Sequence, residues 1–185
     1  LLSAIWRGSK MSTREEYSVK AIKSFHGHDG YGWECKLYDP ANKFVAFVVE
    51  DGWGGDLQFH WNDEELAHVE TTFTNTMGTE VVTKQTPAQS ALTKFCMESP
   101  KWKCNDEMVH TCPDVLMSDL VENALTMKDV KKMLKKVAIF DDGKVYTYNV
   151  APSHSTIRTV IAKKYPDAIV LNDVSLSEAI EIYKG

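Results

Sequence analysis

The sequence predicts an α+β protein in which the strands come first and the helices follow. Residues 17–61 contain short runs of alternating hydrophobicity joined by glycine-rich loops and one tight turn. Residues 113–136 carry apolar residues at helical spacing, and residues 137–185 switch between strand and helix patterns. We therefore expect an N-terminal antiparallel β-meander with a helical middle and a C-terminal β-hairpin–helix–strand–helix module.

Four strands are expected in the N-terminal part. The segments 33–37 and 57–61 alternate apolar and polar residues, as strands with one buried face do, whereas 17–21 alternates less strictly. Residues 44–49 are apolar throughout, which predicts a central strand covered on both faces. The turn residues of 39–43 and the short connections favour an up-and-down antiparallel arrangement.

Two glycine-rich loops, 26–32 and 51–56, join the first strand to the second and the third to the fourth. In an up-and-down meander these two connections lie at the same end of the sheet, so we expect the loops to be neighbours. That end would gather the candidate binding residues of this part of the chain, which are His26, His28, Asp29, Tyr31, Asp51, Trp53 and Asp56.

The middle of the chain gives a weaker pattern. Acidic residues at 62–65 and apolar residues at helical spacing predict a helix from there to about Met77, although the segment is rich in threonine. Residues 79–112 are expected to be an irregular insertion. Within it, 80–83 resembles a short strand, and 88–97 resembles a helix that begins at Pro87.

The C-terminal part is more regular. Two consecutive helices are expected, to about Thr126 and over 128–136, before a strand at 137–140. Asp142-Gly143 predicts a two-residue hairpin turn into a strand at 145–150. A helix over 152–165 and a strand at 168–171 follow, and a last helix over 175–183 begins with the capping box of Ser175 and Glu178.

The expected domain organisation is an N-terminal sheet plus helix (11–78), the insertion (79–112) and a C-terminal α+β module (113–185), either separate from the first part or packed with it. Residues 1–10 are interpreted as a candidate non-native extension, because Met11 followed by Ser12-Thr13 resembles a natural start. No secretory signal is recognisable in them.

Charge divides the chain unevenly. The net charge is −5, but residues 1–126 hold 11 Lys+Arg against 19 Asp+Glu, and residues 127–185 hold 10 against 7. The two parts therefore have net charges of −8 and +3, which suggests surfaces with different partners. Four cysteines in 185 residues are too few for a disulfide scaffold, so a cytoplasmic location in a host cell is expected. No apolar run reaches membrane-spanning length.

A lysine-rich stretch is the main basic feature. Its residues follow the spacing i, i+3, i+4, i+7, i+8, which predicts one basic helix face that could meet nucleic acid, an acidic protein or a membrane surface. A solvated helix surface is the plainer explanation. The residues are Lys128, Lys131, Lys132, Lys135 and Lys136.

Phosphate binding is one interpretation of the glycine loops, because backbone N–H groups of such loops can cradle an anion. The glycine order of 27–32 differs from the dinucleotide fingerprint, and the loop leads into a strand and not a helix. Wide turns that use the positive φ angles open to glycine explain the loops equally well.

A metal or acid–base site is a second interpretation, since histidine and carboxylates supply both chemistries. The loop histidines and aspartates, with His60, match no strict motif. Cys96, Cys104, His110 and Cys112 have spacings that suit structural zinc poorly. The sequence therefore predicts no metal site and no cofactor.

Trp53 stands out among the tryptophans. Trp33 and Trp61 have the alternation of core residues, but Trp53 lies between glycines in a loop and has no such pattern. Exposed tryptophan is a frequent anchor of interfaces and a stacking surface for bases. We therefore expect it to be a contact residue and not part of the core.

The glycine block resembles an N-terminal block found in small accessory proteins of phages and prophages. The motif is Phe25-x-Gly27-x-x-Gly30-x-Gly32, followed by Leu37-Tyr38, Val45-Ala46, Asp51-Gly52-x-Gly54-Gly55 and Trp61. The segment from Phe140 to Leu171 is similar to the same proteins, whereas 88–112 is not. The family has no established activity, and the resemblance implies an accessory factor that binds host components.

Three functions follow, in order of preference. The first is a small cytoplasmic binding protein that engages and inhibits a host protein, for instance a defence protein. The second is a module that binds a nucleotide or another small phosphorylated ligand in the glycine loops. The third, an enzyme such as a metal-dependent hydrolase or nuclease that uses the loop histidines and aspartates, is the least favoured.

Overall fold

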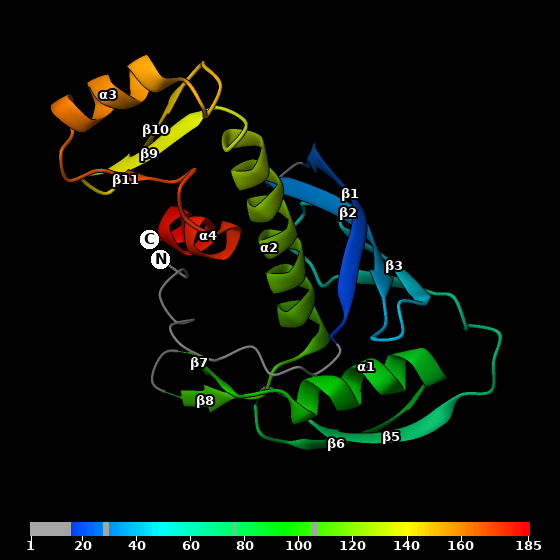
Figure 1. Ribbon diagram of the computed structural model, residues 1–185. Helices are drawn as coiled ribbons and strands as arrows, with labels where there is room; N and C mark the ends of the chain where they lie inside the picture. The colour runs from blue at the N-terminus through cyan, green and yellow to red at the C-terminus, as the bar shows by residue number, and fades with distance from the viewer. Residues whose placement is uncertain (1–15, 28–29, 76, 105–106) are drawn as a thin grey trace. The chain divides into compact units, whose positions relative to one another are not determined.

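The computed structural model describes residues 16–27, 30–75, 77–104 and 107–185 (Figure 1). The chain divides into two compact units, Leu1–Glu122 and Asn123–Gly185, which we call unit 1 and unit 2. Helix α2, Pro113–Met133, runs across the division. The division lies C-terminal to the segment 79–112, in which the sequence placed the boundary, and it coincides with the change from acidic to basic composition.

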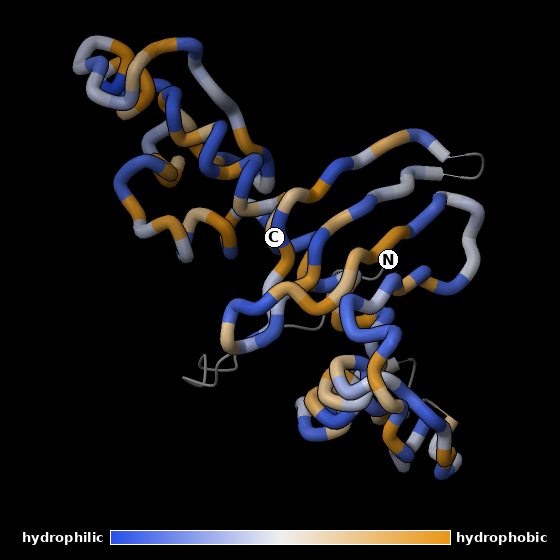
Figure 2. Tube along the Cα trace, turned by 90° about the vertical axis from the view of Figure 1, so that its right-hand side faces the viewer, coloured by the Kyte–Doolittle hydropathy of each residue, from blue (hydrophilic) through white to orange (hydrophobic). Residues whose placement is uncertain are grey.

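The main sheet of unit 1 is the predicted antiparallel meander. It has the order β1-β2-β3-β4, formed by Ser18–His26, Tyr31–Tyr38, Phe44–Glu50 and Gln58–Trp61. Strand β1 is longer than predicted, because it passes through an irregularity between Lys20 and Lys23 and continues to His26. Figure 2 shows how hydrophilic and hydrophobic residues are distributed along the Cα trace.

The centre of this sheet is apolar. Cys35 of β2 pairs with Val48 of β3, and Leu37 pairs with Ala46, and all four are fully buried. Val45, which alternates with Ala46 and so points to the opposite face, is buried as well. Strand β3 is therefore covered on both faces, as its continuous apolar run predicted.

The predicted helix over 62–77 is wrong. Turns follow β4, and then β5 (Val69–Thr74) and β6 (Glu80–Gln85) form an antiparallel hairpin. Threonine and valine dominate both strands, and their branched side chains favour the extended chain over the helix. At the turn, Asn75 Oδ1 accepts hydrogen bonds from the N–H groups of Met77 and Thr79.

The described residues of 79–112 form mostly regular elements, so the expected irregular insertion is wrong, whereas the short strand expected at 80–83 and the helix expected at 88–97 are confirmed. After β6 comes helix α1, Pro87–Glu98, which starts at the predicted proline and is capped by Thr86. It packs against β5, where the buried Thr71 hydroxyl donates to Ser90 Oγ at 2.8 Å. A short hairpin of β7 (Trp102–Cys104) and β8 (Glu107–Val109) leads to α2.

Unit 2 follows the predicted order closely. Strands β9 (Val137–Asp141), β10 (Lys144–Tyr148) and β11 (Ile169–Val170) form an antiparallel sheet in the order β10-β9-β11. Helix α3, Ser155–Lys164, contributes Ile161 to a core with Val137 and Ile139. Helix α4, Leu176–Lys184, begins with the predicted capping box.

Two local predictions in unit 2 have clear outcomes. The Asp142-Gly143 turn is confirmed, since both residues have the positive φ angles of 47° and 73° that a two-residue hairpin turn of this sequence requires. The two predicted helices before β9 are instead the single helix α2, and residues 134–136 form a turn. No proline or glycine interrupts the chain near Thr126, so nothing ends the helix there.

Candidate functional site

The two glycine-rich loops touch through their backbones, which confirms that they are neighbours. A Cβ atom on Gly27 would lie 2.7 Å from the carbonyl oxygen of Asp51 and 2.8 Å from the Cα of Gly52. A Cβ on Gly52, which has a φ of 73°, would lie 3.0 Å from the Cα of Gly27 and 3.1 Å from the nitrogen of Gly32. Only glycine allows this approach, so contact between the loops explains Gly27 and Gly52.

The first loop is tighter than predicted. His26 and Tyr31 belong to β1 and β2 and pair across the strands, with their ring centroids 4.4 Å apart. The turn between them is closed by the hydrogen bond from Gly27 N–H to the carbonyl oxygen of Gly30, at 2.7 Å. The candidate residues His28 and Asp29 lie outside the described residues.

The second loop is held by its own acidic residues. The two carboxylate oxygens of Asp51 accept hydrogen bonds from the Trp53 N–H at 2.9 Å and from the Gln58 side chain at 3.2 Å. The Gly52 N–H donates to the Glu50 carboxylate at 3.0 Å. Both oxygens of Asp51 are thus engaged inside the loop, so this candidate binding residue has a structural role.

Asp56 lies near a carboxylate that the sequence did not single out. Asp114, in the first turn of α2, is half-buried, and this burial raises the pKa of its carboxyl above the ordinary value. The negative charges of Asp56 and Glu50 raise that pKa further, whereas a hydrogen bond from the Leu57 N–H opposes the shift. An aspartate in the first turn of a helix is common, because its charge stabilises the helix N-terminus. The sequence pattern therefore did not predict that Asp114 lies near the distant loop.

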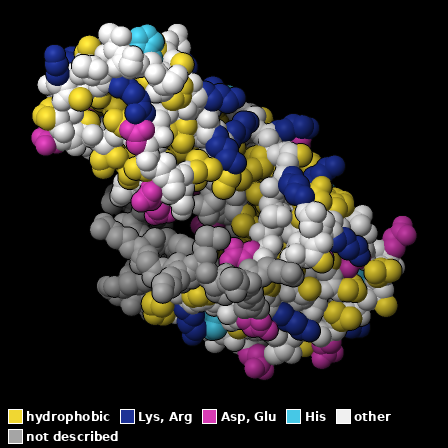
Figure 3. All heavy atoms as spheres, in the orientation of Figure 1, with side chains coloured by type: hydrophobic (Ala, Val, Ile, Leu, Met, Phe, Trp, Pro, Cys, Tyr) yellow, Lys and Arg dark blue, Asp and Glu magenta, His cyan; other side chains and the backbone are white. Residues whose placement is uncertain are grey.

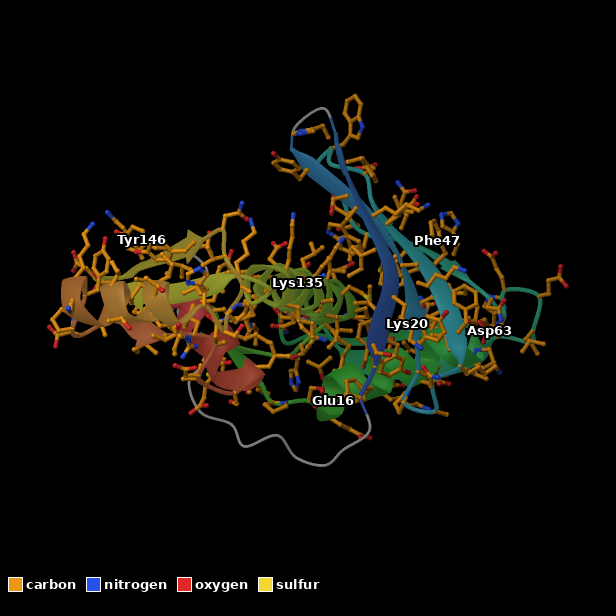
Figure 4. The ribbon with its side chains drawn as sticks, turned by 45° about the horizontal axis from the view of Figure 1, so that its top comes forward. Glu16, Lys20, Phe47, Asp63, Lys135 and Tyr146 are labelled. Atoms are coloured by element: carbon orange, nitrogen blue, oxygen red, sulfur yellow. The ribbon has the colours of Figure 1, made fainter. Side chains whose placement is uncertain are left out.

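Large aromatic side chains are exposed at this end of the sheet. Tyr31 is 73% exposed, Trp53 is 62% exposed and Phe25 is 39% exposed. The Phe25 ring lies where a Cβ on Gly32 would stand, so it covers that glycine across the strand pair. We call Phe25, His26, Tyr31 and Trp53 the aromatic tip. Figure 4 shows side chains standing outward around this end of the β1–β2 hairpin.

Other candidate groups are dispersed. His60 is exposed on β4 beside the ring of Phe47, with centroids 6.3 Å apart. In the part of the chain that the structure describes, no three His, Cys, Asp or Glu side chains are placed to hold a metal ion. Two surface hollows, of about 270 and 210 Å³, lie in unit 1, and none of the four tip residues lines either of them.

The cysteines behave as core residues. Cys35 and Cys96 are buried, and burial raises the pKa of each thiol to about 12. Cys112 is half-buried, and all three are free thiols. The side chain of Cys104 is outside the described residues.

Cys35 and Cys96 should therefore resist alkylation in the native protein. A thiol with a pKa near 12 holds almost no thiolate at pH 8, and thiolate is the reactive form. Treatment with iodoacetamide at pH 8, followed by peptide mass spectrometry, should leave both residues unmodified until urea is added. Rapid labelling of either one without denaturant would show that its core region opens easily.

The predicted lysine face is partly wrong. All five lysines are exposed, as expected, but only Lys128, Lys131 and Lys132 lie on α2, while Lys135 and Lys136 belong to the turn that follows. Figure 3 shows the Lys and Arg side chains of the visible face in dark blue. No helix among the described residues is long and apolar enough to cross a membrane.

Comparison with known proteins gives no further assignment. No protein-family model matches the chain, and no curated protein or solved structure shows significant similarity to it. The resemblance to phage and prophage accessory proteins therefore stays a prediction.

Proposed function

We propose that the protein is a binding protein that engages a partner protein through the aromatic tip. The observation that carries this proposal is the exposure of Tyr31 and Trp53, at 73% and 62%, on a backbone that is held by contact between two loops. Aromatic residues contribute much of the binding energy of protein interfaces. Tyrosine and tryptophan each have a large apolar surface, and its burial against a partner is favourable.

The backbone of the aromatic tip is already ordered without a partner. Gly27 and Gly52 fix the two loops against each other, and the His26 ring rests on Tyr31. Side chains that are already ordered lose less conformational entropy on association, so more of the contact energy appears as affinity. A host protein is the partner class that the phage resemblance implies, and inhibition of that protein in the host cytoplasm is the corresponding role.

The phosphate-binding alternative has less support. A phosphate in the glycine loops would need free backbone N–H groups. The N–H groups of Gly27, Gly52 and Trp53 already donate to the Gly30 carbonyl, the Glu50 carboxylate and the Asp51 carboxylate. The two carboxylates would also repel an anion at this place. The metal-dependent hydrolase alternative also has less support, because no three His, Cys, Asp or Glu side chains among the described residues are placed to hold a metal ion.

Trp53→Ala tests the proposal. Because Trp53 is mostly exposed, we expect its loss to cost roughly 1 kcal/mol or less of folding stability, well below the 3–5 kcal/mol of a buried aromatic truncation. Binding to the partner should weaken by about 2 kcal/mol or more. The two measurements are the free energy of unfolding in urea and the recovery of a partner from host lysate by tagged protein.

Leu66→Ala is the matched control for this test. Leu66 is 56% exposed, belongs to unit 1 and lies outside the tip. Its truncation should change neither stability nor recovery of the partner. A large loss of stability in Trp53→Ala, or equal recovery of the partner by both variants, would contradict the proposed interface.

A further inference from the structure

The C-terminal end of α2 presents lysines from a turn that is fixed in place. Helical winding tightens after Met133, with hydrogen bonds from the N–H groups of Lys135 and Lys136 back to residues 132 and 133 at 3.4 and 3.0 Å. The Asn172 side chain donates to the carbonyl oxygens of Leu134 and Lys136, at 3.0 and 2.9 Å. The exposed Lys135 and Lys136 therefore extend the lysine row of α2 along a defined path.

These lysines form a cluster of positive charge with few acidic residues beside it in the sequence. Between residues 128 and 136 there are five lysines and a single acidic residue, Asp129. Elsewhere in unit 2, Arg158 forms a two-point ion pair with Asp173, and Lys184 donates to Asn123, whereas Lys144 and Lys163 are exposed. The lysine row is the densest group of cations in a unit with net charge +3, whereas unit 1 has a net charge of −8.

Two stacked tyrosines, Tyr146 and Tyr165, lie in the part of unit 2 that follows the lysine turn, and we call them the aromatic platform. Tyr146 of β10 stacks on Tyr165, with centroids 6.5 Å apart and ring planes 18° apart, and Tyr146 is 42% exposed. The side chains of Lys164 and Tyr148 lower the pKa of the Tyr165 hydroxyl. The Lys164 Nζ lies over the Tyr165 ring, 5.1 Å from its centroid.

The lysine turn leads directly into β9, the strand that pairs with β10, and β10 carries Tyr146. Lys136 directly precedes Val137, which pairs with Tyr148, and Tyr146 is two residues further along the same strand. Tyr146 therefore lies roughly 7 Å along β10 from Tyr148, the strand partner of Val137. Strand β10 is at the edge of its sheet, so it pairs with a strand, β9, on one side only among the described residues. Figure 4 labels Lys135 and Tyr146, which mark the two parts of this surface.

We propose that unit 2 binds single-stranded nucleic acid, with the lysine row contacting phosphates and Tyr146 stacking on a base. Lysine side chains neutralise phosphates without regard to sequence, and exposed aromatic rings stack on unpaired bases. Membrane insertion is disfavoured because the apolar residues on these turns are inside the protein: Val130 is fully buried and Met133 and Leu134 are half-buried.

The test is the binding of the full chain to fluorescein-labelled oligonucleotides, followed by fluorescence anisotropy between 50 and 200 mM salt. The probes are a thymidine 20-mer and a 20-base-pair duplex. We expect binding of the single strand that weakens steeply with salt, because contacts with four or five phosphates give a slope of about −3 in log K against log salt. The duplex should bind more weakly, because its bases are not available for stacking.

Two variants and a control assign the surface. Lys131→Glu together with Lys135→Glu should weaken single-strand binding by at least tenfold and make the salt slope shallower. The control, Lys94→Glu together with Lys101→Glu, makes the same change of net charge on exposed residues of unit 1 and should reduce binding only slightly. Tyr146→Ala should weaken single-strand binding about tenfold while leaving the weaker duplex binding unchanged.

The opposing outcomes are equally definite. No binding of the single strand at 50 mM salt would overturn the proposal, and so would equal losses in the two lysine pairs. Tighter binding to the duplex, or no effect of Tyr146→Ala, would remove the stacking platform and with it the single-stranded ligand. Binding to anionic vesicles of phosphatidylserine, but to neither oligonucleotide, would assign the lysine row to a lipid surface instead.

Discussion

Gly27→Ala is expected to destabilise unit 1 by about 2–3 kcal/mol, whereas Gly30→Ala in the same hairpin turn should cost almost nothing. The new Cβ on residue 27 would stand 2.7 Å from the Asp51 carbonyl oxygen and 2.8 Å from the Gly52 Cα. Both atoms belong to the backbone of the other loop and cannot rotate away. Overpacking of this kind costs about 1–3 kcal/mol, because the surrounding structure must shift.

The comparison with Gly30 isolates the contact between the loops. Neither Gly27 nor Gly30 has a positive φ angle, so neither replacement incurs a backbone penalty. Among the described residues, no atom lies within 4 Å of a Cβ built on Gly30. Alanine there should even stabilise slightly, since it restricts the unfolded chain. Equal unfolding free energies for the two variants in urea would show that the loops are not in contact.

The same pair of variants also bears on function. If the glycine contact holds the aromatic tip ready for its partner, Gly27→Ala should weaken partner recovery although every aromatic side chain remains. Gly30→Ala should recover the partner normally. A variant that is less stable yet binds normally would separate the fold of the loops from the proposed interface.

Patterns set by local chemistry were predictable from the sequence. Asp142-Gly143 forms the expected turn because both residues tolerate positive φ angles, and Ser175 forms the expected capping box with Glu178. The neighbouring glycine loops also followed, because connections one and three of a meander share an end. In each case the deciding interaction lies within a few residues, or follows from the order of the strands.

What the sequence did not predict depends on partners that are distant along the chain. A helix was predicted over 62–77 because the apolar spacing of 66, 69 and 73 fits a helix. The structure has the β5–β6 hairpin there, and the hydrogen bond of Thr71 with Ser90 cannot be read from a local stretch of sequence. Asp114 contacts a loop more than fifty residues away, near Leu57. For the tip, the sequence identified Trp53 and Tyr31, but the ring of Phe25 over Gly32 needed the strand register.

Asn172 is the clearest example of a residue whose partners are distant along the chain. Its removal should be the most destabilising single change in unit 2. Its Oδ1 accepts from the N–H of Ala138 at 2.8 Å, and its Nδ2 donates to the Leu134 and Lys136 carbonyls. One side chain therefore ends α2, fixes the turn and anchors the start of β9. Ala138 is fully buried, so water cannot replace the lost partner of its N–H.

Asn172→Ala should lower the stability of unit 2 by about 3 kcal/mol. Each hydrogen bond contributes about 0.5–1.5 kcal/mol, and a buried donor left without a partner costs about 1–3 kcal/mol. Because the chain has two units, a single global transition is a poor measure, and amide hydrogen exchange at Ala138 is the direct readout. Its protection should fall, while that of Val48 in unit 1 should stay unchanged.

Two further variants separate hydrogen bonding from packing at this position. Asn172→Asp keeps the side-chain shape and the acceptor for Ala138, but it sets a carboxylate oxygen against the two carbonyl oxygens, so it should destabilise at least as much as alanine at neutral pH. Asn149→Ala, an exposed asparagine of the same unit, should change stability by less than about 0.5 kcal/mol. If Asn172→Asp were as stable as the wild type, the two donated bonds would not hold the turn, and the fixed path of Lys135 and Lys136 would lose its support.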